Sequence, residues 1–317
     1  KVFVDYHRAQ RGLIGEKECL GNRELYLKVN DKMPGAIAFY GVPVKTRELF
    51  GVLHLKGMVF DDVLLYSGAS INNVYLHWQE NYRLDWYYQI NSCQLADSFC
   101  RYLDEVFVQS NLACLLNAQS IPSKGQQKRL SQRLKSRIKK ARYCIQNPAM
   151  PRSETNVMSV EPLVGCGRRG NRLNATIRQL IKGAEHNLLI FTPYFNFPKV
   201  VTGDLTRALK RGVRVTLVVG DKKANDFFIA QDKDFSAIGI IPYVYEILLL
   251  RFIKRWQSFV DSGQLNIHLW QHGNNSFHLK GLIADERYHL LTGSNLNPRA
   301  WGLDLENGLL IDDAGKG

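Results

Sequence analysis

HLKGMVFD, residues 54–61, has a near copy in HLKGLIAD, residues 278–285 of the same chain. Each copy reads His-Leu-Lys-Gly, then three apolar or small residues, then Asp. In an extended strand, side chains two positions apart point to the same side, so the His and the Lys of each copy share a face. We therefore expect the first copy to lie in a strand over residues 52–60. Two such copies indicate a duplication within the chain.

The similarity continues beyond these segments. SGASINN, residues 67–73, follows the first copy, and TGSNLNP, residues 292–298, follows the second. Further on, Asp85 and Glu306 each lie five residues before an isoleucine. Similarity at so long a period indicates two similar domains rather than a solenoid. We expect two half-sites, each with a His, a Lys and a carboxylate, to meet across a pseudo-two-fold axis.

Length and composition are those of a soluble globular protein of two domains. The chain has 317 residues, 45% of them hydrophobic and 22% charged. It contains no apolar run of about 18 residues, so we expect no membrane-spanning helix. The six cysteines include no C-x-x-C pair, and we expect no zinc site. The first five residues resemble a strand already under way, so we expect that an N-terminal part of the first domain is missing.

The second half of the chain alternates strands and helices. We expect helices over residues 174–186 and 205–211, and strands over residues 188–192 and 213–219. This alternation indicates an α/β fold. We expect a first domain over residues 1–120, a basic helix with a linker over residues 121–155, and a second domain over residues 156–317.

The net charge of +13 is concentrated in one segment. Residues 124–142 contain nine Lys or Arg and no acidic residue, with an apolar residue every three or four positions. Three interpretations remain open. The segment is a solvated helix that packs its apolar stripe on a domain, a surface helix for anionic lipid, or a face for nucleic acid.

Two histidines that face each other suit a displacement at phosphorus. One imidazole attacks, and the other protonates the leaving oxygen and then deprotonates the incoming nucleophile. Lys56 and Lys280 would neutralise phosphate oxygens, and no metal ion is required. Asp85 and Glu306 would each hydrogen-bond the far ring nitrogen of a histidine and fix its tautomer. Further hydrogen-bond donors to the phosphate would come from Ser70, Asn72, Asn295 and Asn297.

The duplicated H-x-K-x-x-x-x-D pattern resembles the signature of the phospholipase D superfamily. The resemblance implies two phospholipase-D-like repeats, with mixed sheets flanked by helices and related by a pseudo-two-fold axis. Within the superfamily, the chain resembles the Gram-negative type of phosphatidylserine synthase over nearly its whole length. The segments that carry this resemblance are residues 5–12, 40–43, 192–196, 220–227 and 297–301.

This resemblance implies a reaction and roles for residues. The reaction is the transfer of a phosphatidyl group from CDP-diacylglycerol to L-serine, which gives phosphatidylserine and CMP through a phosphatidyl-histidine. In this family the N-terminal histidine is the nucleophile, so the resemblance implies that His54 is the nucleophile and His278 the acid and base. Nothing in the sequence itself distinguishes the roles of the two histidines. Further residues follow strand ends, where α/β proteins bind ligands. They are assigned to the nucleotide or to serine, and they are Arg8, Arg11, Lys222, Asn225 and Asp226.

The resemblance also implies a cytoplasmic enzyme peripherally associated with the inner face of the cell membrane, because one substrate is a lipid. The apolar stretch 247–256 and the basic segment are the candidate docking elements, and a ribosome or another polyanion is an alternative partner of the basic segment. The basic residues assigned to the membrane are Lys128, Arg129, Arg133, Lys135, Arg137, Lys139 and Lys140.

Two other functions remain open. One is a cardiolipin-synthase-like phosphatidyltransferase with a different acceptor, and the other is a phospholipase or nuclease that uses water. An added amino alcohol would change the product of a transferase but not that of a hydrolase.

Overall fold

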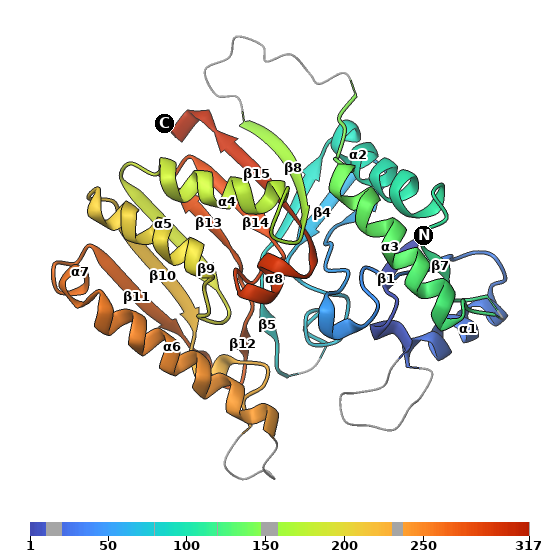
Figure 1. Cartoon of the computed structure of the whole chain (residues 1–317), viewed down its shortest axis with the longest axis horizontal. Coiled ribbons are helices and arrows are strands. Elements are labelled where there is room, and N and C mark those ends of the chain that lie inside the picture. The colour runs from blue at the N-terminus through green and yellow to red at the C-terminus, as the bar shows by residue number, and fades with distance from the viewer. Residues whose placement is uncertain (11–20, 79, 119, 147–157, 230–236, 317) are drawn as a thin grey trace.

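The structure is a computed structural model, and it describes residues 1–10, 21–78, 80–118, 120–146, 158–229 and 237–316. Within these residues the chain forms four β-sheets with helices packed against them (Figure 1). The predicted α/β fold with mixed sheets is confirmed. None of the helices in the described ranges combines the length and the apolarity needed to cross a membrane.

The largest sheet belongs to the C-terminal part of the chain and has seven strands. Three neighbouring strands run parallel to one another, and the remaining pairings are antiparallel. The strands in spatial order are β11 (Leu265–Trp270), β10 (Arg214–Gly220), β9 (Asn187–Thr192), β13 (Gly281–Ala284), β14 (Tyr288–Thr292), β15 (Leu305–Asp313) and β8 (Met158–Cys166).

Helices cover this sheet because each carries one apolar face. Figure 1 shows α4 and α5 side by side against the sheet, with α6 and α7 near β11. In α4, Ile177 and Ile181 recur at helical spacing and are fully buried. The Asn171 side chain caps α4 by accepting a hydrogen bond from the Asn174 amide at 2.9 Å. The helices are α4 (Arg172–Gly183), α5 (Lys199–Lys210), α6 (Ile241–Arg255), α7 (Gln257–Asp261) and α8 (Pro298–Gly302).

The N-terminal part contains two three-stranded sheets. In the first, β1 (Val2–Asp5) and β7 (Cys114–Leu115) lie on either side of β2 (Phe39–Val42). In the second, β4 (Val63–Ser67) lies between β3 (Met58–Phe60) and β6 (Tyr87–Asn91). The helices here are α1 (Asn22–Lys32), α2 (Cys93–Leu103), which continues into a π-helical turn at Asp104–Val108, and α3 (Lys124–Lys140).

The basic helix α3 packs its apolar stripe on the protein. Leu134 is 0% exposed and Ile138 3%, and both belong to a core cluster with Val44 and Phe107. A capping box between Ser123 and Gln126 begins the helix. The interpretation of this segment as a helix packed on a domain is therefore confirmed over Lys124–Lys140, and the seven Lys and Arg side chains of α3 that the structure describes remain exposed.

Two short contacts join the N-terminal and C-terminal parts at the centre of the molecule. β5 (Arg83–Leu84) pairs in parallel with β12 (Ser276–Phe277). An isolated parallel bridge joins Leu53 to Leu305 at the start of β15. Each contact therefore brings a His-x-Lys segment next to the carboxylate-bearing segment of the other part.

The predicted strand over residues 52–60 is wrong in its extent. β3 begins only at Met58, and in the second copy β13 begins at Gly281, so both His-x-Lys triplets precede their strands. The reason is the backbone at the glycine of each motif, where φ is 123° at Gly57 and 142° at Gly281. These values are open to glycine but strained for other residues, and they end the regular strand pairing.

Candidate active site

Backbone hydrogen bonds hold each of the two histidines beside a segment from the other part of the chain. The amide of His54 donates to the carbonyl of Leu305 at 2.9 Å, one residue before Glu306. The amide of His278 donates to the carbonyl of Leu84 at 2.9 Å, one residue before Asp85. Each histidine is therefore anchored beside a carboxylate of the other part of the chain.

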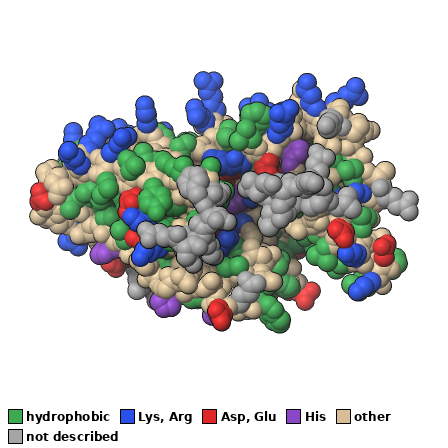
Figure 2. All heavy atoms as spheres, turned by 90° about the horizontal axis from the view of Figure 1, so that it is seen from below, with side chains coloured by type: hydrophobic (Ala, Val, Ile, Leu, Met, Phe, Trp, Pro, Cys, Tyr) green, Lys and Arg blue, Asp and Glu red, His purple; other side chains and the backbone are tan. Residues whose placement is uncertain are grey.

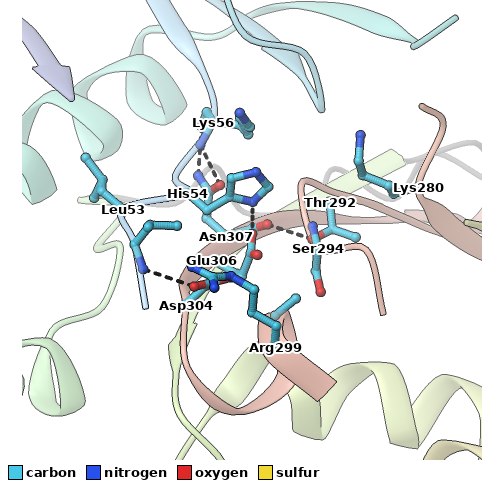
Figure 3. A network of polar contacts seen from close by, with 12 residues as sticks. Leu53, His54, Lys56, Lys280, Thr292, Ser294, Arg299, Asp304, Glu306 and Asn307 are labelled. Carbon is cyan, nitrogen blue, oxygen red and sulfur yellow. Dashed lines mark hydrogen bonds and ion pairs between the residues drawn. The ribbon is translucent and has the colours of Figure 1, made fainter. Parts of the chain in front are cut away.

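The side chains complete two crossed histidine–carboxylate pairs. Nδ1 of His54 lies 2.7 Å from Glu306 Oε2, across 252 residues of sequence. Nδ1 of His278 lies 2.8 Å from Asp85 Oδ2, across 193 residues. Figure 3 shows the His54 ring above the Glu306 carboxylate, with Lys56 above the ring and Lys280 to its right. The expected contact of a carboxylate with the far ring nitrogen is therefore present in both pairs.

The two lysines have different surroundings. Lys280 is 0% exposed, and its Nζ lies 3.2 Å from Asp85 Oδ2 and also contacts His278. Lys56 is less buried and donates to Ser70 Oγ at 2.9 Å. Burial lowers the pKa of each lysine to about 8, against the attraction of the nearby carboxylates. Both lysines are therefore still largely charged at neutral pH.

Burial also moves the histidines and carboxylates toward their neutral forms. Desolvation, and after it the neighbouring lysine of the same motif, lowers the pKa of His54 and of His278 well below the ordinary histidine value. Desolvation raises the pKa of Glu306 to about 8 and also raises that of Asp85. A neutral imidazole has a free electron pair on one nitrogen, so it can act as a nucleophile or a base at neutral pH.

The structure gives most of the predicted hydrogen-bond donors a local partner. Ser70 contacts Lys56 and lies in the site. Asn72 Oδ1 accepts from the Tyr75 amide at 3.1 Å, and Asn297 Oδ1 caps α8 by accepting from the Ala300 amide at 2.9 Å. Asn295 Oδ1 is buried with no hydrogen-bond partner in the described part of the chain.

The residues assigned to the nucleotide or serine do not form one group. Arg8 pairs with Glu48 at 2.8 Å, and its charge lowers the pKa of His54, so it lies near the first motif. Lys222 pairs with Glu246 at 3.0 Å. Asn225 is buried, and its Oδ1 accepts from the Phe227 amide at 2.9 Å. Asp226 is different, because it pairs with Arg83. Arg11 lies outside the described residues.

Several residues of the site were missed at the level of sequence. Asn307 is 0% exposed and holds both backbone groups of Lys56: its Oδ1 accepts from the amide at 2.8 Å and its Nδ2 donates to the carbonyl at 2.8 Å. Asp304 accepts from the Val52 amide at 3.0 Å and pairs with Arg299 at 3.3 Å. The only available signal was their position on either side of Leu305-Glu306. Tyr75 and Arg83, beside the second motif, carried no signal at all.

Comparison with known proteins agrees with this geometry. The family model for the phospholipase-D-like domain of cardiolipin synthase matches residues 177–316. CDP-diacylglycerol–serine O-phosphatidyltransferase of Haemophilus influenzae is 44% identical over 99% of this chain and 69% of its own length. The corresponding enzyme of Escherichia coli K12 is 42% identical over 99% of this chain and 68% of its own length.

A solved structure agrees over the whole chain. The crystal structure of phosphatidylserine synthase from Haemophilus influenzae superposes with a TM-score of 0.93 and 42% identity, and covers 100% of this chain and 70% of that one. Fold and paired His-Lys motifs define a protein of the phospholipase D superfamily. Within that superfamily, the chain belongs to the phosphatidylserine synthase family.

Proposed function

We propose that the protein transfers a phosphatidyl group from CDP-diacylglycerol to L-serine, which gives phosphatidylserine and CMP through a phosphatidyl-histidine. Membership of the family supports this reaction. The observation that carries the mechanism is the pair of crossed contacts, His54–Glu306 and His278–Asp85, each of which engages Nδ1 and directs Nε2 away from its carboxylate.

In the first step, Nε2 of neutral His54 attacks the phosphorus that bears the diacylglycerol. An N–P bond forms and the P–O bond to CMP breaks. His278 is neutral in the free protein, but the negative charge of the bound diphosphate favours its protonated form, so His278 takes a proton from solvent and gives it to the leaving oxygen. In the second step, neutral His278 takes the proton of the serine hydroxyl. The serine oxygen bonds to phosphorus, the N–P bond breaks, and His54 is restored.

The surroundings of the two Nε2 atoms support His54 as the nucleophile. In the described part of the chain, Nε2 of His54 has no hydrogen-bond partner. Nε2 of His278 instead lies 2.7 Å from the hydroxyl of Tyr75. A nucleophile needs an open approach to phosphorus, whereas an acid and base has to exchange a proton with a hydroxyl. The difference therefore favours the roles that the family resemblance implies.

The lysines would stabilise the negative charge that builds on the phosphate oxygens. Lys56 and Lys280 bring their positive charges to the site from different parts of the chain, and neither has to move to supply this stabilisation. Ser70, which contacts Lys56, is the most direct additional contact, and the amide nitrogen of Asn295 remains a proposed donor. Asn72, Asn297, Arg8, Lys222 and Asn225 remain proposed substrate contacts, and those partnered to other residues would have to exchange partners.

The crossed pairs also support the proposed organisation of the chain. Two phospholipase-D-like repeats, over residues 1–120 and 156–317 and related by a pseudo-two-fold axis, would each supply a His-Lys pair and a carboxylate to the other. Both motifs meet the other part through short parallel contacts. This similarity of the two contacts is what a pseudo-two-fold relation requires.

A peripheral association with anionic membrane at the inner face of the cell membrane belongs to the same proposal. The basic side chains of α3 stay exposed, and Figure 2 shows Lys and Arg side chains projecting along one edge of the molecule. The second proposed docking element, α6, buries Leu249 and Phe252 but exposes Val244, Ile247 and Leu250. An apolar face flanked by Arg251 and Lys254 suits the membrane interface.

The test is a vesicle assay with CDP-diacylglycerol, with and without L-serine, that follows CMP and the lipid product. We expect serine-dependent release of CMP, reduced at least about a thousandfold in His54→Ala because the nucleophile is lost. His268→Ala, at an exposed histidine of β11, is the matched control and should retain activity. Equal CMP release without serine, with phosphatidic acid as product, would mean a hydrolase and would overturn the acceptor assignment.

A further inference from the structure

A group of charged and aromatic side chains lies beside His278, and the mechanism above uses only the contact of one of them, Tyr75, with this histidine. Its first member, Tyr75, places its hydroxyl 2.7 Å from His278 Nε2, and the two rings meet edge to face at 4.9 Å. The guanidinium of Arg83 lies over the Tyr75 ring, 5.1 Å from its centroid. Nε of Arg83 lies 3.1 Å from Asp226 Oδ1, and the hydroxyl of Tyr194 donates to Asp226 Oδ2 at 3.3 Å.

The fold fixes this group relative to the reacting nitrogen. Arg83 is in β5, one residue before Leu84, whose carbonyl accepts the amide of His278. Asp226 lies beyond the end of β10, at the edge of the large sheet where α/β proteins bind ligands. The group therefore draws its two charges from different parts of the chain and holds them next to the proposed acid and base.

The ion pair of this group lies at the border between the core and solvent, and Asp226 Oδ1 is buried with no hydrogen-bond partner in the described part of the chain. The Arg83 side chain is 26% exposed and that of Asp226 15%, so the pair is neither sealed in the core nor free in solvent. A guanidinium has five N–H donors, so the contact of Nε with one carboxylate leaves donors for another. Asp226, in turn, is a carboxylate that can accept from a second cation.

These charges match the chemistry of an amino-acid acceptor. The hydroxyl that attacks the phosphatidyl-histidine has to reach Nε2 of His278, where the Tyr75 hydroxyl now lies. In serine, the ammonium and the carboxylate are both within about 4 Å of the hydroxyl oxygen, because only two carbons separate them from it. A zwitterion bound with its hydroxyl at His278 therefore places one positive and one negative group beside Tyr75.

We infer that Arg83 and Asp226 form the subsite that binds the α-carboxylate and the α-ammonium of a zwitterionic acceptor, with Tyr75 and Tyr194 as its walls. This inference rests on the proposed function and deepens it. An acceptor phosphate would be repelled by Asp226, and a polyol would gain no ionic contact, so a pair of opposite charges selects an amino acid over both. The sequence assigned Asp226 to the nucleotide or to serine, and the structure favours serine.

The test compares three acceptors that share the hydroxymethyl group. Serinol lacks the carboxylate, and 3-hydroxypropanoate lacks the ammonium. In the wild type, we expect kcat/KM for each analogue to be at least about tenfold below that for L-serine, because each leaves one charge of the pair unmatched. Equal use of serinol and serine by the wild type would overturn the inference without recourse to any variant.

Two substitutions should each change the selectivity between serine and one of the two analogues. Arg83→Gln should lower the preference for serine over serinol by at least about tenfold, because the contact with the carboxylate is lost. Asp226→Asn should lower the preference for serine over 3-hydroxypropanoate by a similar factor. A merely structural role would lower all three rates together and leave both ratios unchanged, and this outcome would also overturn the inference.

The matched control is a similar group far from the site. Arg287 pairs with Asp312 at 2.6 Å and lies over Tyr288, beyond the opposite end of β13 from His278. Arg287→Gln and Asp312→Asn should change neither ratio. Exchange of labelled CMP into CDP-diacylglycerol, which needs no acceptor, is measured in parallel. Absence of exchange in the wild type would refute the proposed phosphatidyl-histidine, whereas exchange with unselective acceptor use would refute only the subsite.

Discussion

Burial sets the protonation of the four central side chains. His54 and His278 are kept neutral by desolvation and by the lysine two residues away, whereas Lys56 and Lys280 have pKa values of about 8. A lysine with this pKa is charged below pH 8 and loses its charge as the pH rises through that value. The electrostatic stabilisation that we assign to the two lysines should therefore be present at neutral pH and lost in alkali.

The pH profile of kcat/KM tests this assignment, because kcat/KM reports the free enzyme. Above about pH 8, two titrating lysines should give log kcat/KM a slope that approaches about −2. Lys56→Arg keeps its charge and leaves Lys280 as the titrating lysine of the site, so its slope should be less steep than that of the wild type by about 1. Glu306, whose pKa is also about 8, titrates in both proteins and does not change this difference.

The control for this profile is Lys199→Arg, at the start of α5, which should reproduce the wild-type profile. An unchanged alkaline slope in Lys56→Arg would show that Lys56 is not one of the groups that limit activity.

At the scale of elements, the glycine of each motif decides where the strand begins. Gly281 has a φ of 142°, and a methyl group at its Cα would overlap the carbonyl oxygen of Leu290 on β14. β13 therefore pairs closely with β14 only because residue 281 has no side chain. The preceding residue is Lys280, so the same glycine also fixes the position of a proposed catalytic lysine.

We expect Gly281→Ala to lower the free energy of unfolding by about 2 to 4 kcal/mol, because it combines backbone strain with overpacking. Urea unfolding followed by circular dichroism measures the change. Gly183→Ala, at the exposed end of α4, has no atom within 4 Å of the added methyl and should be neutral or stabilising by up to about 1 kcal/mol. Equal midpoints for the two variants would contradict the close packing of β13 on β14.

At the scale of the whole molecule, the site belongs to neither half of the chain. Each histidine takes its carboxylate partner from the other part, so the proposed catalytic centre forms only when both parts are folded together. The excess charge is separate from this centre. It is concentrated on α3, whose apolar stripe packs in the core, so in the proposed membrane contact α3 would contribute its positive charge and would not insert into the lipid.

Charge reversal on α3 tests the proposed membrane contact. Each basic residue near an anionic membrane contributes about 1 kcal/mol, so Arg133→Glu with Lys135→Glu should weaken binding to anionic vesicles by at least about thirtyfold. The measurement is cosedimentation with vesicles of phosphatidylglycerol and phosphatidylethanolamine. Activity toward CDP-diacylglycerol in detergent micelles should change little, because α3 is not part of the catalytic centre.

The control variant, Lys32→Glu with Arg214→Glu, has the same change of net charge at two residues that lie outside α3. If this control binds vesicles as weakly as the α3 variant, only net charge matters and α3 is not a docking element. If the α3 variant instead loses binding to RNA but not to vesicles, the polyanion alternative replaces the membrane.

The sequence by itself determined the class of chemistry and much of the secondary structure. The motifs at 54–61 and 278–285 were visible because each is local and occurs twice. The strands near residues 188–192 and 213–219 were visible because each is a short, largely apolar run next to a helical segment, as β9 and β10 confirm. The extent of the strand at 52–60 was wrong, because the effect of Gly57 depends on its φ and not on its neighbours in sequence.

Only the tertiary structure decided which carboxylate serves which histidine, and it alone placed Arg83 with Asp226. These partners are separated by 252 residues for His54 and Glu306 and by 193 for His278 and Asp85. They meet because β5 pairs with β12 and Leu53 with Leu305, and a pairing between distant segments leaves no periodic trace in either of them. Local patterns therefore identify the reacting groups, whereas long-range strand pairing decides how they are combined.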